Sequence, residues 1–209
     1  MENPNDKMIK KVYNAIAEGF YNIRQQPITP EIEQVAKKWM PGKILDIGCS
    51  IGNSLLPFAK TGFQCYGIDI SHRMISLAKQ YANKHDVRYF LKTSTMLKLP
   101  FKKHEFDYVI SIAAFHHLDN EKKRLRALSE IKRVLSPEGK FFITVWYKRT
   151  PDKDVYIPWN RKGVSYNRYY HFFTKEELSN IFRKSGIKSK IYMDKHRKNI
   201  CITGNNLLS

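Results

Sequence analysis

Apolar residues recur at helical spacing twice near the start of the chain. The first pattern covers residues 9–20 and the second covers residues 32–39, and each predicts an amphipathic helix. Pro41 and Gly42 end the second pattern. We expect residues 1–40 to form an N-terminal helical cap on the fold that follows.

From residue 43 onward, short apolar runs alternate with amphipathic stretches. Ser71 is placed to cap a helix after the second run, and a charged helix over about residues 120–135 precedes a turn at residues 136–139. This order predicts a mostly parallel sheet with helices on both faces. The five strands that we predict here span residues 43–47, 64–70, 87–91, 106–112 and 140–146.

The last third of the chain has a different pattern. Residues 147–172 are rich in Tyr, Arg, Lys and Pro and show no clear period, so we interpret them as an insertion on the substrate side. Thr174 and Glu177 form a capping box that begins a further helix. Two short strands near residues 190–193 and 199–202 predict a closing hairpin. Because no repeat or linker interrupts these patterns, we interpret residues 1–209 as a single α/β domain.

Composition places the chain among ordinary globular proteins. It has 209 residues, of which 42% are hydrophobic and 27% charged, and no apolar run is long enough to span a bilayer. The N-terminus has no signal-peptide pattern, so we expect a cytoplasmic protein without a membrane partner. The cysteines are far apart and form no CxxC pair, which favours buried free thiols and predicts no metal site. They are Cys49, Cys65 and Cys201.

The charge balance adds information about partners. The chain has 37 Lys and Arg against 19 Asp and Glu, a formal net charge of +18. Residues 148–198 alone hold 14 Lys and Arg against 5 Asp and Glu. This enrichment favours a basic face that binds a polyanion, RNA or DNA, over lysines that are spread evenly in solvent.

Two acids and a glycine loop carry the strongest chemical signal. Asp46 lies at the end of the first predicted strand, a loop containing Gly48 and Gly52 follows, and Asp69 ends the next strand 23 residues later. An acid at that distance accepts ribose hydroxyls in nucleotide-binding α/β units. Asp46 would repel a pyrophosphate but suits a cationic ligand, although its role as an acceptor for loop amides explains it too. S-adenosylmethionine carries an ammonium and a sulfonium and no phosphate, so we predict this methyl donor.

Several segments in chain order resemble the motifs of class I methyltransferases. The resemblance covers roughly residues 12–146 and implies a seven-stranded, Rossmann-like sheet whose last strand is antiparallel, in agreement with the predicted hairpin. The segments are Leu45–Cys49, Gly67–Asp69, Leu99–Phe101, Phe106–Val109 and Leu135–Gly139.

A narrower resemblance is to the eukaryotic and archaeal tRNA wobble-uridine carboxymethyl methyltransferases. That family esterifies 5-carboxymethyluridine in the tRNA anticodon loop, and its members typically work with a small zinc-binding activator protein. Ser50 departs from its pattern, where Gly is usual, and so does Thr95, where an acid often reaches the adenine. The matching segments are Val12–Phe20, Ile110–His117, Asp154–Trp159 and Arg168–His171, together with Arg24 and Arg124.

From these patterns we predict three groups of site residues. The donor site comprises Tyr13, Arg24, Asp46, Gly48, Cys49, Gly52, Asp69, Ile70, Met74, Thr95, Met96 and Ile112. Positioning of the acceptor is assigned to His116, His117 and Arg124, with no general base because a carboxylate is already ionised at neutral pH. Contact with splayed-out RNA bases is assigned to Trp159, Arg161, Arg168, Tyr169, Tyr170 and His171.

Alternatives remain open at this point. Core packing explains His116 and His117 as well as a site does, and a solvated helix face explains Arg124. A methyltransferase that acts on a small molecule would carry the same motifs around the donor. A non-catalytic RNA-binding paralogue is a further alternative, because Ser50 and Thr95 depart from the family pattern.

Overall fold

The computed structural model describes residues 4–25, 30–161 and 163–206. Its main feature is a seven-stranded sheet with the order β3-β2-β1-β4-β5-β9-β8. Strands β1 to β5 are parallel, and β9 is antiparallel to both of its neighbours. This arrangement confirms the predicted fold. The strands are β1 (Lys43–Ile47), β2 (Gln64–Asp69), β3 (Tyr89–Thr93), β4 (Phe106–Ile112), β5 (Leu135–Trp146), β8 (Ser189–Met193) and β9 (Asn199–Asn205).

Helices cover both faces of this sheet. Along β1, Leu45 and Ile47 belong to the core under α5 and α6, whereas Ile44 belongs to the core with α2 and α3. A parallel sheet buried on both faces needs such apolar residues at successive positions. The helices are α1 (Pro4–Ile23), α2 (Glu31–Lys38), α3 (Leu56–Ala59), α4 (His72–Lys84), α5 (Glu121–Val134) and α6 (Lys175–Lys184). None of the helices in the described ranges is long and apolar enough to cross a membrane.

Two predicted caps are present, and the end of α4 explains one shifted strand. Ser71 Oγ accepts the N–H of Met74, and Thr174 Oγ1 accepts that of Glu177. At the other end of α4, Asp86 has a φ of 52°, and the N–H of Val87 donates to Ala82 O over 3.0 Å. This hydrogen bond belongs to the motif that ends α4, and it engages the N–H of Val87. Strand β3 therefore begins at Tyr89, two residues later than predicted.

The predicted turn at residues 136–139 is wrong. These residues lie inside β5, whose register against β4 shifts between the pairs Phe106–Leu135 and Tyr108–Lys140. The Asn206 side-chain amide donates to the carbonyl oxygens of Lys132, Leu135 and Ser136. These bonds tie the end of α5 to the start of β5 where the ladder is interrupted, and the segment forms a bulge in the strand.

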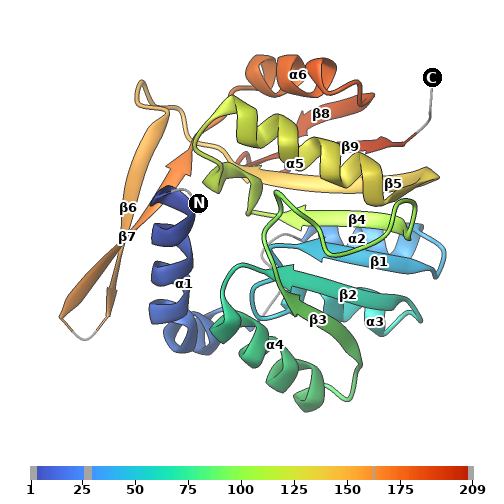
Figure 1. Ribbon diagram of the computed structural model, residues 1–209, viewed down its shortest axis with the longest axis horizontal. Helices are drawn as coiled ribbons and strands as arrows, with labels where there is room; N and C mark the ends of the chain where they lie inside the picture. Colours follow the sequence, from blue (N-terminus) through green and yellow to red (C-terminus); the bar gives the residue numbers. More distant parts are fainter. Residues whose placement is uncertain (1–3, 26–29, 162, 207–209) are drawn as a thin grey trace.

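Residues 147–172 contain regular structure that the sequence patterns did not predict. Strands β6 (Asp154–Arg161) and β7 (Val164–His171) pair with each other in a separate antiparallel sheet. Figure 1 shows this hairpin and α1 together at the end of the main sheet toward which the arrowheads of β2 and β4 point. The carboxyl ends of the parallel strands therefore face both elements, and ligands bind at that edge in open α/β sheets.

Candidate active site

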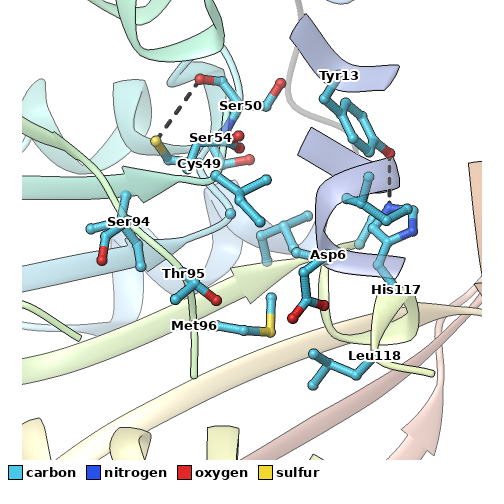
Figure 2. Close-up of a pocket in the computed structure, with 18 of the residues that line it drawn as sticks. Asp6, Tyr13, Cys49, Ser50, Ser54, Ser94, Thr95, Met96, His117 and Leu118 are labelled. Atoms are coloured by element: carbon cyan, nitrogen blue, oxygen red, sulfur yellow. Dashed lines mark hydrogen bonds between the residues drawn. The ribbon is translucent and has the colours of Figure 1, made fainter. Parts of the chain in front are cut away.

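A cavity of about 880 Å³, counting the part open to solvent, lies at this edge of the sheet. The loop after β1, the end of β2, the loop after β3 and the end of β4 form one wall, and α1 forms the other (Figure 2). Its lining consists of Asp6, Ile9, Tyr13, Phe20, Gly48, Cys49, Ser50, Asn53, Ser54, Ile68, Asp69, Ile70, Ser94, Thr95, Met96, Ile112, Ala113, Ala114, His117 and Leu118.

The glycine loop is held close to the neighbouring strands. The backbone N–H groups of Gly48 and Cys49 both donate to Ile68 O over 2.8 Å. Gly48 has a φ of +80°, and a Cβ there would lie 2.5 Å from the Cβ of Ala114. Only glycine fits this position, because both the backbone conformation and the space exclude a side chain.

Asp69, at the end of β2, is the strand-end acid that lines the cavity. Its Oδ2 accepts the N–H of Ser50 over 2.9 Å, and its Oδ1 accepts that of Ser71 over 2.8 Å. Burial raises the pKa of this carboxyl to about 6, against the lowering effect of the backbone N–H donors. Each oxygen of a carboxylate has two lone pairs, so both can accept a further hydrogen bond from a ligand hydroxyl.

Asp46 is close to Asp69 but is not among the lining residues. Its side chain is buried, and its Oδ1 has no hydrogen-bond partner among the described residues. Burial, and then the negative charge of Asp69, raise the pKa of Asp46 well above its usual value. Two carboxyls beside one loop favour a cationic ligand and disfavour a pyrophosphate, so the loop fits S-adenosylmethionine.

Ser50 has the left-handed conformation that glycine adopts freely. Its φ is 51°, and its hydroxyl donates to Met74 Sδ over 3.5 Å. We expect Ser50→Gly to raise the free energy of unfolding by about 0.5–1 kcal/mol, because the strain on a residue with a Cβ is removed. Urea denaturation measures this change.

The matched control is Asp86→Gly, since Asp86 has a φ of 52° and lies outside the cavity lining. Both variants should be stabilised, but only Ser50→Gly should change the affinity for S-adenosylmethionine. A Ser50→Gly protein less stable than the wild type would show that the backbone at residue 50 is not strained.

The α1 wall is bonded to the opposite side of the cavity. Tyr13 Oη lies 2.8 Å from His117 Nε2, and His117 Nδ1 lies 2.7 Å from Tyr169 O (Figure 2 draws the first contact). A carbonyl only accepts, so Nδ1 carries the proton and Nε2 accepts from the tyrosine hydroxyl. Burial lowers the pKa of His117 to about 4, with a smaller contribution from the charge of Arg168. His117 is therefore neutral at pH 7, and both of its ring nitrogens are engaged.

Of the two predicted histidines, only His117 lines the cavity. His116 is buried next to it, and its Nδ1 accepts the N–H of Trp146 over 3.1 Å. Burial lowers the pKa of His116 well below its usual value. Its ring packs against Trp146 and Tyr170, which places His116 in the aromatic core behind the site.

Arg124 is neither in the cavity nor on a solvated helix face. Its side chain is buried, with Nη1 3.2 Å from Glu177 Oε1 and Nε donating to Leu118 O over 3.2 Å. The guanidinium also lies over the ring of Phe173. All of these partners belong to the chain, so Arg124 connects α5 to α6.

The structure brings most of the predicted donor residues together. Four lie outside the lining: Arg24, Asp46, Gly52 and Met74. Gly52 shapes the loop through its φ of +78°, and Arg24 lies 5.9 Å from the Phe20 ring centre. The predicted donor residues that line the cavity are Tyr13, Gly48, Cys49, Asp69, Ile70, Thr95, Met96 and Ile112.

The predicted RNA contacts are not an exposed stacking surface. Trp159 is half-buried and stacks on Phe20 with ring centres 5.8 Å apart. The side chain of Arg161 lies outside the described part of the structure. The hairpin turns this face toward α1 and the aromatic core, which explains the burial of Arg168, Tyr169, Tyr170 and His171.

Of the residues that α1 contributes to the lining, the prediction included Tyr13 and missed Asp6, Ile9 and Phe20. Asp6 also pairs with Lys123 over 2.8 Å. The apolar pattern of the first helix was a usable signal, because Ile9, Tyr13 and Phe20 lie on its inner face. The pattern predicts that this face of the helix is buried, but it does not predict a cavity between the helix and the sheet.

An adenosine-binding edge of this kind, on a sheet closed by an antiparallel strand, defines one class of protein, the class I S-adenosylmethionine-dependent methyltransferases. The family model described as a methyltransferase domain matches residues 45–143. "Putative methyltransferase ECU09_1500" of Encephalitozoon cuniculi is 31% identical over 69% of this chain and 70% of its own length. The chain belongs to this methyltransferase family.

Other relatives and a solved structure agree with this assignment. The tRNA (carboxymethyluridine(34)-5-O)-methyltransferase of Schizosaccharomyces pombe is 29% identical over 87% of this chain and 89% of its own length. The mouse "Probable tRNA methyltransferase 9B" is 31% identical over 73% of this chain, which spans only 34% of that relative. A methyltransferase solved with the Trm112 activator of Haloferax volcanii has a TM-score of 0.72 at 17% identity, over 96% of this chain and 98% of its own.

Proposed function

We propose that this methyltransferase esterifies the carboxylate of 5-carboxymethyluridine at the wobble position of tRNA. The observation that carries the proposal is the state of His117, which is neutral and has both ring nitrogens engaged. The two acids in the lining also have partners, since Asp6 pairs with Lys123 and Asp69 accepts backbone N–H groups. Each of these groups in the described lining therefore already has a hydrogen-bond or ion-pair partner, which favours an acceptor that is nucleophilic without a general base.

A carboxylate meets this requirement. Its reference pKa near 4 leaves it ionised at neutral pH. S-adenosylmethionine supplies a methyl group on a sulfonium, and transfer to a carboxylate oxygen forms an ester and a neutral thioether without moving a proton. The chain's own contribution is then to hold and align the two molecules, worth up to about 7–11 kcal/mol, and to exclude water. Asp69 and the glycine loop hold the donor, and the Tyr13–His117 pair forms the wall beside the acceptor.

Two further observations support a tRNA acceptor and a protein partner. The net charge of +18 suits a polyanion, and the Schizosaccharomyces pombe relative is named for carboxymethyluridine at position 34 of tRNA. A methyltransferase of the same fold was solved in complex with the Haloferax volcanii Trm112 activator. We therefore include a small zinc-binding activator protein of this kind as a partner in the proposal, and the cytoplasm as its location.

The decisive experiment is a methyl-transfer assay on total tRNA, followed by mass analysis of the nucleosides, with and without an activator protein. The expected product is the methyl ester of 5-carboxymethyluridine. Methyl transfer to another nucleoside would overturn the proposed acceptor. Methylation of small molecules but not tRNA would support the small-molecule alternative, and failure to bind S-adenosylmethionine in calorimetry would support a non-catalytic protein.

The affinity for S-adenosylmethionine should depend on pH through Asp69. The pKa of its carboxyl is about 6 in the folded protein, against an ordinary value of 3.8. The ionised form is the better acceptor for ribose hydroxyls, so the affinity should be constant above pH 7 and about tenfold lower at pH 5. Isothermal titration calorimetry at both pH values measures this. Equal affinity at pH 5 and pH 7 would contradict the assignment.

The same raised pKa makes the stability of the ligand-free protein depend on pH in the opposite direction. The folded carboxyl binds its proton more tightly than the unfolded one, so this group's contribution to stability is present below pH 4 and lost as the pH rises through about 6. Donor affinity and the Asp69 contribution to stability should therefore change in opposite directions between pH 4 and pH 7.

A further inference from the structure

Arg168 is a buried cation that forms no ion pair with any residue that the structure describes. Only 6% of the residue is exposed, and its Nε has no hydrogen-bond partner among the described residues. Within the same ranges, no carboxylate lies within ion-pair distance of its guanidinium. Burial of a charge is unfavourable unless an opposite charge and hydrogen bonds compensate for it. Arg124, by contrast, has Glu177 and a carbonyl oxygen as partners.

The guanidinium of Arg168 lies between two aromatic rings. Its central carbon is 5.1 Å from the ring centre of Trp159 and 5.3 Å from that of Tyr170. Aromatic faces attract a cation, but they accept none of its five N–H groups in the plane of the guanidinium. The contacts with the two rings thus leave the Nε of Arg168 without a hydrogen-bond partner among the described residues.

On two sides, a single side chain separates Arg168 from a residue that lines the cavity. Trp159 stacks on Phe20, which lines the cavity. Tyr170 packs against His117, which also lines it, with ring centres 4.6 Å apart. The charge of Arg168 is near enough to contribute to the lowered pKa of His117, after burial. The unpaired cation thus lies beside the part of the cavity wall where α1 meets the hairpin.

We propose that Arg168 binds the carboxylate of the acceptor nucleotide and thereby selects an anionic acceptor. This inference rests on the proposed function, because it names the residue that recognises the group to be esterified. An arginine matches a carboxylate through two parallel N–H···O bonds. Arg168 thus takes the acceptor-positioning role that the sequence patterns assigned to Arg124. The guanidinium of Arg124 cannot fill it, because it is already bonded within the fold.

The test is a double-mutant cycle between the protein and the RNA. Wild type and Arg168→Gln are each titrated with the same tRNA carrying either 5-carboxymethyluridine or unmodified uridine at the wobble position. We expect Arg168→Gln to weaken binding of the carboxymethyl tRNA about tenfold and binding of the unmodified tRNA less than twofold. The affinity for S-adenosylmethionine should not change. Arg183→Gln removes the same charge from an exposed position on α6 and should act equally on both tRNAs.

Two outcomes would overturn the proposal. An equal loss on both tRNAs would assign Arg168 to a backbone phosphate, and no loss on either would show that it binds neither group. If Arg168→Gln does not fold, Arg168→Lys keeps the charge but not the two parallel bonds. It should retain only part of the preference for the carboxymethyl tRNA, whereas full retention would contradict the proposal.

The cycle also separates this inference from the proposed function. If the wild type transfers no methyl group to carboxymethyl tRNA with an activator present, the proposed function fails. If the wild type methylates that tRNA and Arg168→Gln does so with the same kcat and KM, the function stands and only the assignment of Arg168 fails.

Discussion

Asp69→Ala should weaken S-adenosylmethionine binding about a hundredfold or more. The carboxylate that we assign to the donor ribose is lost, and the backbone N–H groups of Ser50 and Ser71 lose their acceptor. A hydrogen bond to a charged group contributes about 1.5–3 kcal/mol, and each 1.4 kcal/mol is a factor of ten in affinity. Two bonds to the ribose therefore account for the expected loss, and disorder of the glycine loop would increase it.

Calorimetric titration measures this loss, and Asp107→Ala is the matched control. Asp107 is an exposed acid at the start of β4 that also accepts a backbone N–H, from Lys43 over 2.8 Å. Its replacement should leave the affinity for the donor unchanged. The same affinity in wild type and Asp69→Ala would show that the donor sugar is not bound at the end of β2.

Glu177→Ala should lower the free energy of unfolding by about 3–5 kcal/mol. Its carboxylate contacts Arg124 Nη1 at 3.2 Å, His171 Nε2 at 2.8 Å and Lys153 Nζ at 3.2 Å. Arg124 and His171 are buried, and removal of one member of a buried ion pair leaves an uncompensated charge. The bonds also connect α5, α6 and the β6–β7 hairpin, so packing among these elements should weaken as well.

Chemical denaturation measures the change in stability, and Glu176→Ala is the control, because Glu176 is the exposed neighbour on the same helix. That variant should unfold at nearly the wild-type urea concentration. Glu177→Gln retains an oxygen acceptor and should lie between the two alanine variants. Wild-type stability of Glu177→Ala would mean that the buried arginine finds another partner.

The sequence was sufficient to predict the main sheet, because short apolar runs alternate with amphipathic helical stretches in the order that a parallel α/β sheet requires. It was not sufficient for the β6–β7 hairpin. Pro158 discourages a strand assignment, but it pairs with Asn167 in a two-stranded sheet where every strand is an edge. Arg168 and His171 were assigned to an exposed RNA contact, but aromatic rings bury Arg168, and His171 is buried beside two acids.

The candidate site was predictable mainly on the side of the sheet, whereas on the side of the helix only Tyr13 was predicted. Asp69 and the glycine loop follow their strands directly, so strand order places them together. The position of α1 across the cavity depends on contacts between residues far apart in the chain, such as Tyr13 with His117 and Asp6 with Lys123. His116 and His117 are adjacent in sequence, and only the turn after β4 decides which of them faces the cavity.

The β6–β7 hairpin belongs to its own sheet and shares no ladder with the seven-stranded sheet in the described ranges. The backbone ladder of the hairpin is therefore separate from the strands that carry the donor loop. A homologous hairpin with a different residue at position 168 should change which acceptor is admitted, provided that the hairpin keeps its contacts with Phe20, His117 and Glu177. Chimeras that exchange residues 154–171 between relatives are thus a direct route to new acceptor specificities on this scaffold.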